Sequence, residues 1–429
     1  MKKLVLAGAL AALVSAPVLA VDQTVPGAGN AEAMSVAGAS PLVQGKVRYL
    51  EREAAGIGDA AVRAATLDAI GHSPCVTHRA GLDAARKKAV LDRLAAEGLV
   101  SAADAAAFPG GAAAGIFPPV LEDGTSCPKL PQLFFSAPGS SYGGHHGHPG
   151  GLPVHEAFNE RASLSLGAGY DAVYGKPQHE DAGESCDHDF IRHSGLEINH
   201  DVLVAAPIWH DWAKTIVFQW NADGSEFKEF SFGGTGTGDG FGGSAGDSRT
   251  GAHHILGVAE AIQRRLPPDL VITQACAHSN PTYGNEYKVV NWIRAAAIIA
   301  GRDPVADGYL VKLADGTFRL PPLRKLGEVA MPASSGNFLP EYVIHNLSDA
   351  DYIFTGPSMT AVLEVLKTLA PRYGFAVPGP TDDPTHYNWR YRNRVLARTA
   401  SERLFFLYAN GGVAAVQKEL DGLRKLGAI

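Results

Sequence analysis

Five histidine and aspartate residues have the types and spacing for metal chemistry. They stand beside or within segments that we expect to be helical: His155, the adjacent pair His210 and Asp211, His253 and His278. Imidazole nitrogens and carboxylate oxygens together suit Zn, Mn, Fe, Co or Ni more than Ca or Mg. Adjacent residues on a helix point about 100° apart, so we expect His210 and Asp211 to reach ions held between helices, where Asp211 can bridge two ions. The pattern predicts a site for one or two divalent transition-metal ions.

Lys214 follows Asp211 by three positions and therefore lies on the same helical face. Its ammonium group is suited to hold a phosphate or to donate a proton, and the structural alternative is an ion pair with Asp211. A compact histidine group, His145, His146 and His148, lies in the glycine-rich stretch GGHHGHPGG. For this group adventitious metal binding is the simpler interpretation, and a place at the rim of a pocket is the alternative.

Helical periodicity predicts the elements that must position these residues. The expected helices span 153–166, 196–214, about 252–265, 269–278 and 287–300. After the second of them, TIVFQW and SEFKEFSF surround the turn sequence NADG and predict a β-hairpin. The stretch 233–251 is rich in glycine, and we expect it to form a mobile flap.

The rest of the chain is also expected to be mainly α-helical. Residues 21–45 lack periodicity and predict a loose leader, residues 46–106 have helical periodicity, and further helices follow from about residue 333. The expected organisation is a helical lead-in with a Pro/Gly-rich connection at 21–140, a metal-binding domain at 141–305 and a C-terminal helical extension at 306–429.

Four segments of the chain resemble, in order and context, the HD-domain phosphohydrolases, and specifically the branch that includes HD-domain exoribonucleases. They are HPGGLPVHEAF at 148–158, NHDVLVAAPIWHDWAK at 199–214, GAHHILG at 251–257 and AHSNP at 277–281. The resemblance covers roughly residues 140–305. It implies a mainly α fold, an HD-domain helical bundle with a small β-hairpin and extra helical segments at both ends.

The resemblance also assigns metal ligands. His155 matches the first metal histidine of the family, and His210 and Asp211 match the pair after which the family is named. His253 matches the histidine that opens the next helix, and His278 matches the histidine before a loop. The implied ligand set is the same five residues that the pattern of residue types indicates.

Two neighbouring pairs offer alternatives. His254 adjoins His253. We prefer His253 as the metal ligand because its spacing to Gly257 fits the family pattern, and in the alternative His254 orients or replaces His253. His200 and Asp201 repeat the HD dipeptide, but without a lysine three positions later. We interpret that repeat as incidental, with Asp201 supporting a nearby backbone group.

The sequence departs from the family pattern at one position. The family closes its site with an aspartate on a last helix, and the equivalent stretch, VVNWIRAAAIIAG, contains none. Asn291 lies one helix too early for this role and Asp303 lies about a turn too late. Either residue is a candidate to replace the aspartate.

The resemblance implies metal-assisted hydrolysis of a phosphoester, with a small-molecule or nucleotide-like substrate. Asp211 and Lys214 are the expected catalytic residues, because the first holds metal and the second steadies developing charge. One alternative is a di-iron oxygenase on the same scaffold. A second alternative is a non-catalytic binding protein, which the absent final aspartate and the large flanking segments favour.

Charge and composition bear on possible partners. A net charge of -7 gives no global basic surface for a phosphate backbone, so a dedicated nucleic-acid binder is not favoured. The basic and aromatic run HYNWRYRNRVLAR at 386–398 could stack on a nucleic acid, and the alternative is an amphipathic helix face.

The N-terminus and the cysteines predict export. Residues 1–20 combine two lysines, a short apolar run and a small-residue cleavage signal, as in a secretory signal peptide, which implies a periplasmic or secreted protein. No later segment is expected to span a membrane. Of four cysteines, Cys75 and Cys127 are the preferred disulfide pair, and Cys276, in an apolar run, has a buried free thiol as its alternative.

Overall fold

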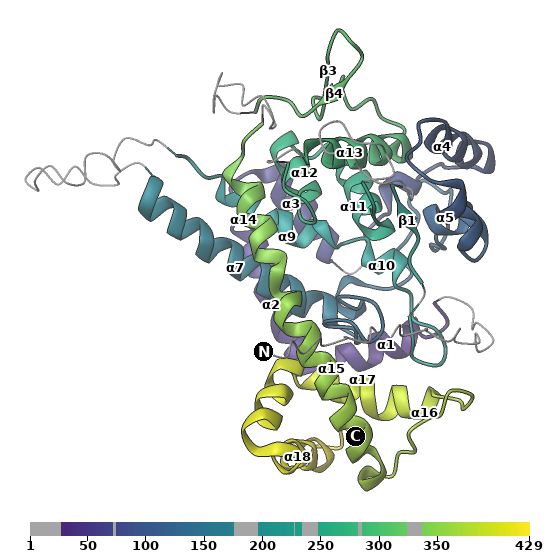
Figure 1. Cartoon of the computed structure of the whole chain (residues 1–429), viewed down its shortest axis with the longest axis vertical. Helices are drawn as coiled ribbons and strands as arrows, with labels where there is room; N and C mark the ends of the chain where they lie inside the picture. Colours follow the sequence, from purple (N-terminus) through teal and green to yellow (C-terminus); the bar gives the residue numbers. More distant parts are fainter. Residues whose placement is uncertain are drawn as a thin grey trace, which may run out of the picture.

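The computed structural model describes residues 27–71, 74–175, 196–226, 228–233, 248–281, 285–323 and 337–429. Within these ranges the chain is mainly α-helical and has two small antiparallel sheets of two strands each (Figure 1). The expected mainly α fold is therefore confirmed. The predicted signal peptide at 1–20 and most of the glycine-rich stretch predicted as a flap lie outside the described residues.

The N-terminal part forms short helices that pack onto the centre of the molecule. These are α1 (Asn30–Gly38), α2 (Pro41–Ala55), α3 (Ala60–Ile70), α4 (Ala84–Ala96), α5 (Ala102–Ala107) and α6 (Gly111–Ile116). Ser40 and Asp59 start α2 and α3, because their side chains accept hydrogen bonds from backbone N–H groups of the first turn. The leader expected at 21–45 is thus wrong from residue 30 onward.

The predicted disulfide is present. Cys75 and Cys127 are bonded across a sequence separation of 52 residues. Cys276 is a buried free cysteine, as its apolar surroundings indicated. The fourth cysteine, Cys186, lies outside the described residues.

A bundle of longer helices forms the centre of the molecule. Its members are α7 (Gly151–Tyr174), α9 (His200–His210), α11 (Ala252–Gln263), α12 (Pro268–Ala275) and α13 (Glu286–Ala300). Every residue of α9 from Val202 to His210 is buried, which is the pattern of a helix surrounded by others. It packs against α3, α7, α11 and α12 (Figure 1).

The expected helix at 196–214 is corrected, and the expected hairpin after it is reduced to a single antiparallel bridge between Trp220 and Glu226 around the NADG turn. α9 ends at His210, and a separate short helix, α10 (Lys214–Val217), takes the β-prone run TIVF. Thr215, Ile216 and Val217 are buried, so packing overrides their strand preference. β1 (Ser231–Phe232) pairs instead with β2 (Thr250–Gly251), which leads directly into α11.

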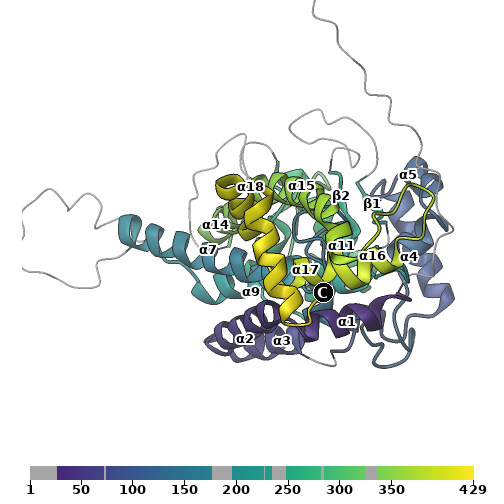
Figure 2. The same cartoon turned by 90° about the horizontal axis from the view of Figure 1, so that it is seen from below.

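The C-terminal part contributes both to the central bundle and to a second core. It contains β3 (Val311–Lys312), β4 (Phe318–Arg319), α14 (Pro340–Ser348), the 3-10 turn η4 (Asp349–Asp351), α15 (Tyr352–Leu369), α16 (Thr385–Tyr387), α17 (Asn393–Arg398) and α18 (Ser401–Lys425). One hydrophobic core runs from Leu50 to Tyr342 and so crosses both expected boundaries, 140 and 305. A second core joins α15, α17 and α18, at the end of the molecule seen in Figure 2.

The basic and aromatic run near the C-terminus is largely buried. The run 386–398 lies in helical turns in which Trp389, Tyr391 and Arg392 are all buried, so these side chains are not available for stacking on a nucleic acid. Among the described helices, none combines the length and the apolar character that crossing a membrane needs.

Candidate metal centre

The structure brings the five predicted residues together around Asp211. His155 comes from α7, His210 ends α9, His253 lies in the first turn of α11, and His278 follows α12. One carboxylate oxygen of Asp211, Oδ2, lies 3.3 Å from His155 Nε2 and 3.4 Å from His210 Nε2. The other, Oδ1, lies 3.2 Å from His253 Nε2. His278 forms a possible ligand group with Asp211 and His253.

A sixth residue, Asp349, completes the group from the turn η4. Its Oδ1 lies 3.1 Å from His155 Nε2 and 3.3 Å from His210 Nε2, and its Oδ2 lies 3.8 Å from His278 Nε2. We call the six residues the metal centre: His155, His210, Asp211, His253, His278 and Asp349.

Asp349 takes the place for which Asn291 and Asp303 were the candidates. Asn291 hydrogen-bonds with Ser248 and with Arg294. Asp303 is fully exposed, where it accepts backbone hydrogen bonds in its own turn. Asp303 belongs to no described group of histidine, cysteine and carboxylate side chains that could hold a metal ion, and the Asn291 side chain is held by Ser248 and Arg294. Both expectations are therefore corrected.

The spacing of these atoms matches that of ligands around shared ions. Two ligand atoms that each lie about 2.1 Å from one ion are about 3.0 to 3.4 Å apart at octahedral or tetrahedral angles. The contacts of Asp211 and Asp349 to His155 and His210 fall between 3.1 and 3.4 Å. Each carboxylate turns its second oxygen toward a further histidine: Asp211 Oδ1 lies 3.2 Å from His253 Nε2, and Asp349 Oδ2 lies 3.8 Å from His278 Nε2. The group could therefore hold a metal ion.

The end of α9 explains how adjacent residues point at one centre. The helix stops at His210, and Asp211 adopts φ -106° and ψ 1°, outside regular helix geometry. The last carbonyls of a helix lack partners within it, and His210 Nδ1 uses one of them by bonding to Pro207 O at 2.7 Å. His210 therefore turns Nε2 inward, and the turn that follows brings the Asp211 carboxylate beside it.

Acidic partners orient two other histidines of the centre. His253 Nδ1 lies 2.5 Å from Glu229 Oε1, which also accepts the backbone N–H of His253. His155 Nδ1 lies 3.3 Å from Asp351 Oδ1. Ligating histidines usually have such a partner on the ring nitrogen that faces away from the metal. Neither Glu229 nor Asp351 could be recognised from a local sequence pattern, because both come from distant segments.

The inward-facing atoms fit a cation. His210 Nε2, His253 Nε2 and Asp211 Oδ1 are buried and make no well-aligned hydrogen bond with other described residues. Burial without partners is costly for such polar atoms. An ion that accepts their lone pairs removes this cost, so the donor set and its environment fit a divalent metal.

The charges of the centre favour cations. Burial alone would lower the pKa of His210, but the carboxylates of Asp211, Glu156 and Asp349 raise it to about 9. His253 behaves in the same way, with burial opposed by Glu229 and Asp211, and its pKa also rises to about 9. Without metal, protons on these histidines balance the aspartates at neutral pH.

Lys214 lies at the wall of the centre. Its ammonium group pairs with Asp211 and donates to the carbonyl of Gly139. Burial would lower the pKa of Lys214, but the Asp211 carboxylate raises it above its ordinary value. The position of Lys214 is compatible with both roles expected for it. It is paired with Asp211, and it also lines the pocket described below, where it can contact a ligand.

Glu156 is a buried carboxyl that sequence reasoning missed. Its Oε2 lies 3.6 Å from His210 Nδ1, and burial raises the pKa of Glu156 to about 8. Its position next to His155 in α7 was visible in the sequence, but the depth of its burial was not.

The remaining candidates point elsewhere. His254 Nε2 lies 3.1 Å from the carbonyl oxygen of Ala275, so its ring packs beside the metal centre without joining it. Asp201 accepts the backbone N–H groups of Gly58 and Asp59, the supporting role expected for it. His200 is paired with Asp171 at the surface.

The metal centre opens into a pocket of about 460 Å³. His155, Asp211, Lys214 and His278 line its floor together with Asp349, and Leu347 and Tyr352 contribute apolar side chains to the wall. Small-molecule sites are commonly clefts of about 300 to 1,000 Å³. The pocket therefore has room for a compact ligand that contacts the metal centre and Lys214 at once.

Comparison of the chain with models of protein families, with curated proteins and with solved structures finds no match. The functional assignment therefore depends on the geometry of the metal centre and on the resemblance of the sequence segments.

Proposed function

We propose that this chain is a divalent-metal hydrolase that cleaves a phosphoester in a small-molecule or nucleotide-like substrate. The observation that supports this most is the placement of Asp211 and Asp349 between two sets of histidines, at the floor of a pocket that also holds the ammonium group of Lys214. Two bridged ions beside a buried cation suit a substrate that carries a phosphoryl group.

The ligand set favours Zn, Mn, Fe, Co or Ni over Ca or Mg, because four of its six members are imidazoles. His155 and His210 would hold one ion and His253 and His278 the other, with the two aspartates between them. When bound, the ions would lower the pKa of a water molecule and polarise a phosphoryl oxygen. A single ion shared by fewer of these residues is the simpler form of the same proposal.

The chain's own residues bind and orient the substrate. Lys214 supplies positive charge in the pocket, and its pairing with Asp211 and Gly139 fixes the ammonium group. Fixed charge that faces developing negative charge is effective because it needs no reorganisation during the reaction. Lys214 therefore stabilises the oxygens of the phosphoryl group as the ester bond breaks.

We also propose that the protein acts outside the cytoplasm. The bond between Cys75 and Cys127 supports this, because disulfides persist in oxidising compartments. The predicted signal peptide at 1–20 implies the same route.

The two alternatives fare differently in view of Asp349. The binding-protein hypothesis has two grounds, the absence of a closing aspartate and the large flanking segments, and Asp349 answers only the first. The di-iron oxygenase hypothesis gains from a bridged ligand set, so it remains the second candidate. Lys214 in the pocket favours the hydrolase, since an anionic phosphoester makes use of its charge. Two irons per chain with a visible absorption band would favour the oxygenase.

The proposal is tested by metal reconstitution and a substrate screen. The purified chain is loaded in turn with Zn²⁺, Mn²⁺, Fe²⁺, Co²⁺ or Ni²⁺ and assayed on phosphomonoesters, phosphodiesters and nucleotides. We expect at least one metal to support turnover, and His210→Ala to abolish both metal binding and activity. The matched control is His200→Ala, in the surface copy of the same dipeptide, which should change neither. Inactivity of every metal-loaded form on all substrates would contradict the proposal.

A further inference from the structure

The glycine-rich loop that precedes α7 is tightly packed. A Cβ atom at Gly147 would lie 2.6 Å from the carbonyl oxygen of Ser141, and one at Gly151 would lie 1.7 Å from the carbonyl oxygen of His146. The His146 carbonyl also accepts the backbone N–H of Gly139 and of His148. The glycines thus allow a close turn of the chain, and the histidines between them are held in place.

His146 itself has a backbone that side chains rarely adopt. Its φ is 53°, in the left-handed region, although it is not a glycine. Such a conformation costs of order 1 kcal/mol and persists where the surrounding structure requires it. Here it directs the buried imidazole toward η4, the turn that also carries Asp349 of the metal centre.

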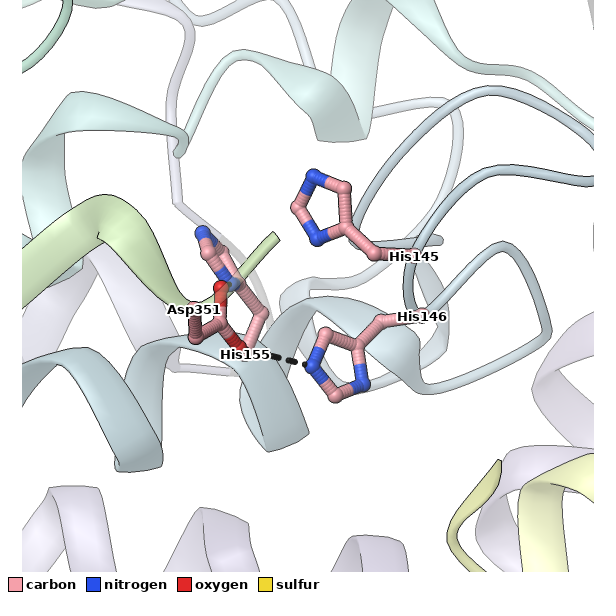
Figure 3. Close-up of side chains that lie close together, drawn as sticks. All are labelled: His145, His146, His155 and Asp351. Atoms are coloured by element: carbon pink, nitrogen blue, oxygen red, sulfur yellow. Dashed lines mark hydrogen bonds and ion pairs between the residues drawn. The ribbon is translucent and has the colours of Figure 1, made fainter. Parts of the chain in front are cut away.

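Three imidazole rings surround the carboxylate of Asp351 (Figure 3). His146 Nε2 lies 3.0 Å from Asp351 Oδ2, and His155 Nδ1 lies 3.3 Å from Asp351 Oδ1. The ring of His145 lies 5.1 Å from that of His155 and 5.8 Å from that of His146, measured between centroids. One ligand atom from each of the four residues lies within 4.8 Å of every other.

Several of these atoms are buried and lack partners. His145 Nδ1, His155 Nδ1 and Asp351 Oδ1 make no well-aligned hydrogen bond with other described residues. His155 is shared between two groups, because its Nε2 faces the metal centre and its Nδ1 faces Asp351. His145 and His146 share a possible ligand group with Asp351 and with one residue of the metal centre, His155, so the loop adds donors beside that centre.

We propose that His145, His146 and Asp351 bind an additional divalent transition-metal ion, next to the metal centre and separate from it. Two imidazoles and a carboxylate are donors that Zn²⁺, Co²⁺ and Ni²⁺ accept. His146 Nε2 and Asp351 Oδ2 are hydrogen-bonded at 3.0 Å, a spacing that neighbouring ligands on one ion also have, so an ion would replace the shared proton. His155 Nδ1 lies 3.3 Å from Asp351 Oδ1, so the His155 ring lies between this loop site and the metal centre.

The loop site lies where it can affect a bound ligand. His145 lines the same pocket as Lys214 and His278. An ion with three protein ligands keeps at least one open coordination position. The additional ion therefore adds positive charge to the pocket wall and binds an anionic group of the molecule that occupies the pocket.

The test is the number of Zn²⁺ ions that the full chain binds, measured by elemental analysis after equilibrium dialysis, together with a Co²⁺ absorption titration. The variants are His145→Ala, which alters a partly exposed side chain, and His146→Asn, because asparagine tolerates the left-handed backbone. We expect each variant to bind one ion fewer than the wild type, or to bind the last ion more than about 100-fold more weakly.

The matched control is His148→Ala. His148 is buried in the same loop, but its Nδ1 faces the carbonyl of Pro149. The substitution should therefore leave the number of bound ions unchanged. His253→Ala, in the metal centre, should keep the loop ion, which separates this site from the proposed activity. The inference is overturned if wild type and His145→Ala bind equal numbers of ions with equal affinity. It is also overturned if His148→Ala loses the ion as well, since the loss would then reflect loop packing.

Discussion

Replacing Asp349 by asparagine removes a negative charge on which contacts with three histidines depend, with almost no change in shape. Asp349 Oδ1 lies 3.1 and 3.3 Å from the Nε2 atoms of His155 and His210, and Oδ2 lies 3.8 Å from His278 Nε2. Asn keeps one oxygen and therefore one neutral ligand at best. Its NH₂ group would face imidazole nitrogens that need a negative partner or a metal.

The size of the effect follows from the position of Asp349. Removing a residue that only orients a metal ligand typically weakens metal binding by about 10- to 100-fold. Asp349 lies at the ligand positions themselves, so Asp349→Asn should weaken binding by more than about 100-fold, or about 2.8 kcal/mol. The metal-free fold should also lose stability, because the protonated histidines beside Asp349 lose the negative charge with which they are paired.

The assay is a competition titration of Zn²⁺ against a chromophoric chelator, with thermal unfolding of the metal-free protein as a second readout. The matched control is Asp303→Asn, since Asp303 was the sequence-based candidate for the same role and is fully exposed. Asp303→Asn should leave metal affinity unchanged. The reasoning is refuted if Asp349→Asn binds Zn²⁺ as tightly as the wild type, or if the two substitutions weaken binding equally.

Three further predictions concern the charge, the pH dependence and the disulfide. Lys214→Met should keep the metal content and lower kcat about 100- to 1,000-fold; an unchanged kcat with an active wild type would exclude Lys214 from catalysis. Metal affinity should rise from pH 7 to pH 9 by about tenfold or more per pH unit. The reason is that metal binding must displace protons from His210 and His253, whose pKa values are about 9. A metal affinity that does not change with pH in the titration would contradict this. Cys75→Ser should lower the free energy of unfolding by about 4 kcal/mol for a loop of this length, and a denaturant midpoint that barely moves would argue against it.

The protonation of His210 also makes the stability of the metal-free fold depend on pH. The pKa of His210 is higher in the folded, metal-free chain than the ordinary value of 6.5. Its ion pairs therefore stabilise the fold fully below about pH 6.5, and this contribution is lost as the pH rises through about 9. Metal binding strengthens over the same interval, so the metal-free and metal-loaded proteins should diverge in Tm between pH 7 and 9.

The metal-binding residues before residue 280 could be predicted from sequence because each lies in a local pattern. His210 and Asp211 follow a long apolar run, and His253 lies in the first turn of the next helix, two residues after Gly251. Such contexts predict helix ends, and helix ends near a buried bundle bring side chains together. The sequence could not show that α9 stops at His210, since the apolar periodicity continues through TIVF and only packing in three dimensions separates α10.

Asp349 was missed for a different physical reason. It lies in the stretch NLSDAD, beyond the expected end of the metal-binding domain at residue 305. Acidic residues after a helix are common in turns, so nothing in the local pattern marks this one as a ligand. Only the packing of α14 against α7, α9 and α12 brings η4 to the metal centre. A search for aspartates after every predicted helix would have included it among several candidates.

For the loop with three histidines, composition was a poor guide to structure. Its composition, with glycine on both sides of His145 and His146, suggested flexible chain and adventitious metal binding. The structure has the same glycines in a close-packed turn with a left-handed His146. Composition alone does not distinguish glycines that loosen a chain from glycines that allow two backbone segments to touch.

The most direct test of the central claim is an anomalous-scattering map from crystals of the chain soaked in Zn²⁺ or Mn²⁺. The account predicts a strong peak about 2.0 to 2.3 Å from the Nε2 atoms of His155 and His210, shared with Asp211 and Asp349. A second peak is expected on the side of His253. A map with no peak among these residues, under conditions in which metal is bound elsewhere on the chain, would contradict the metal centre and with it the proposed hydrolase.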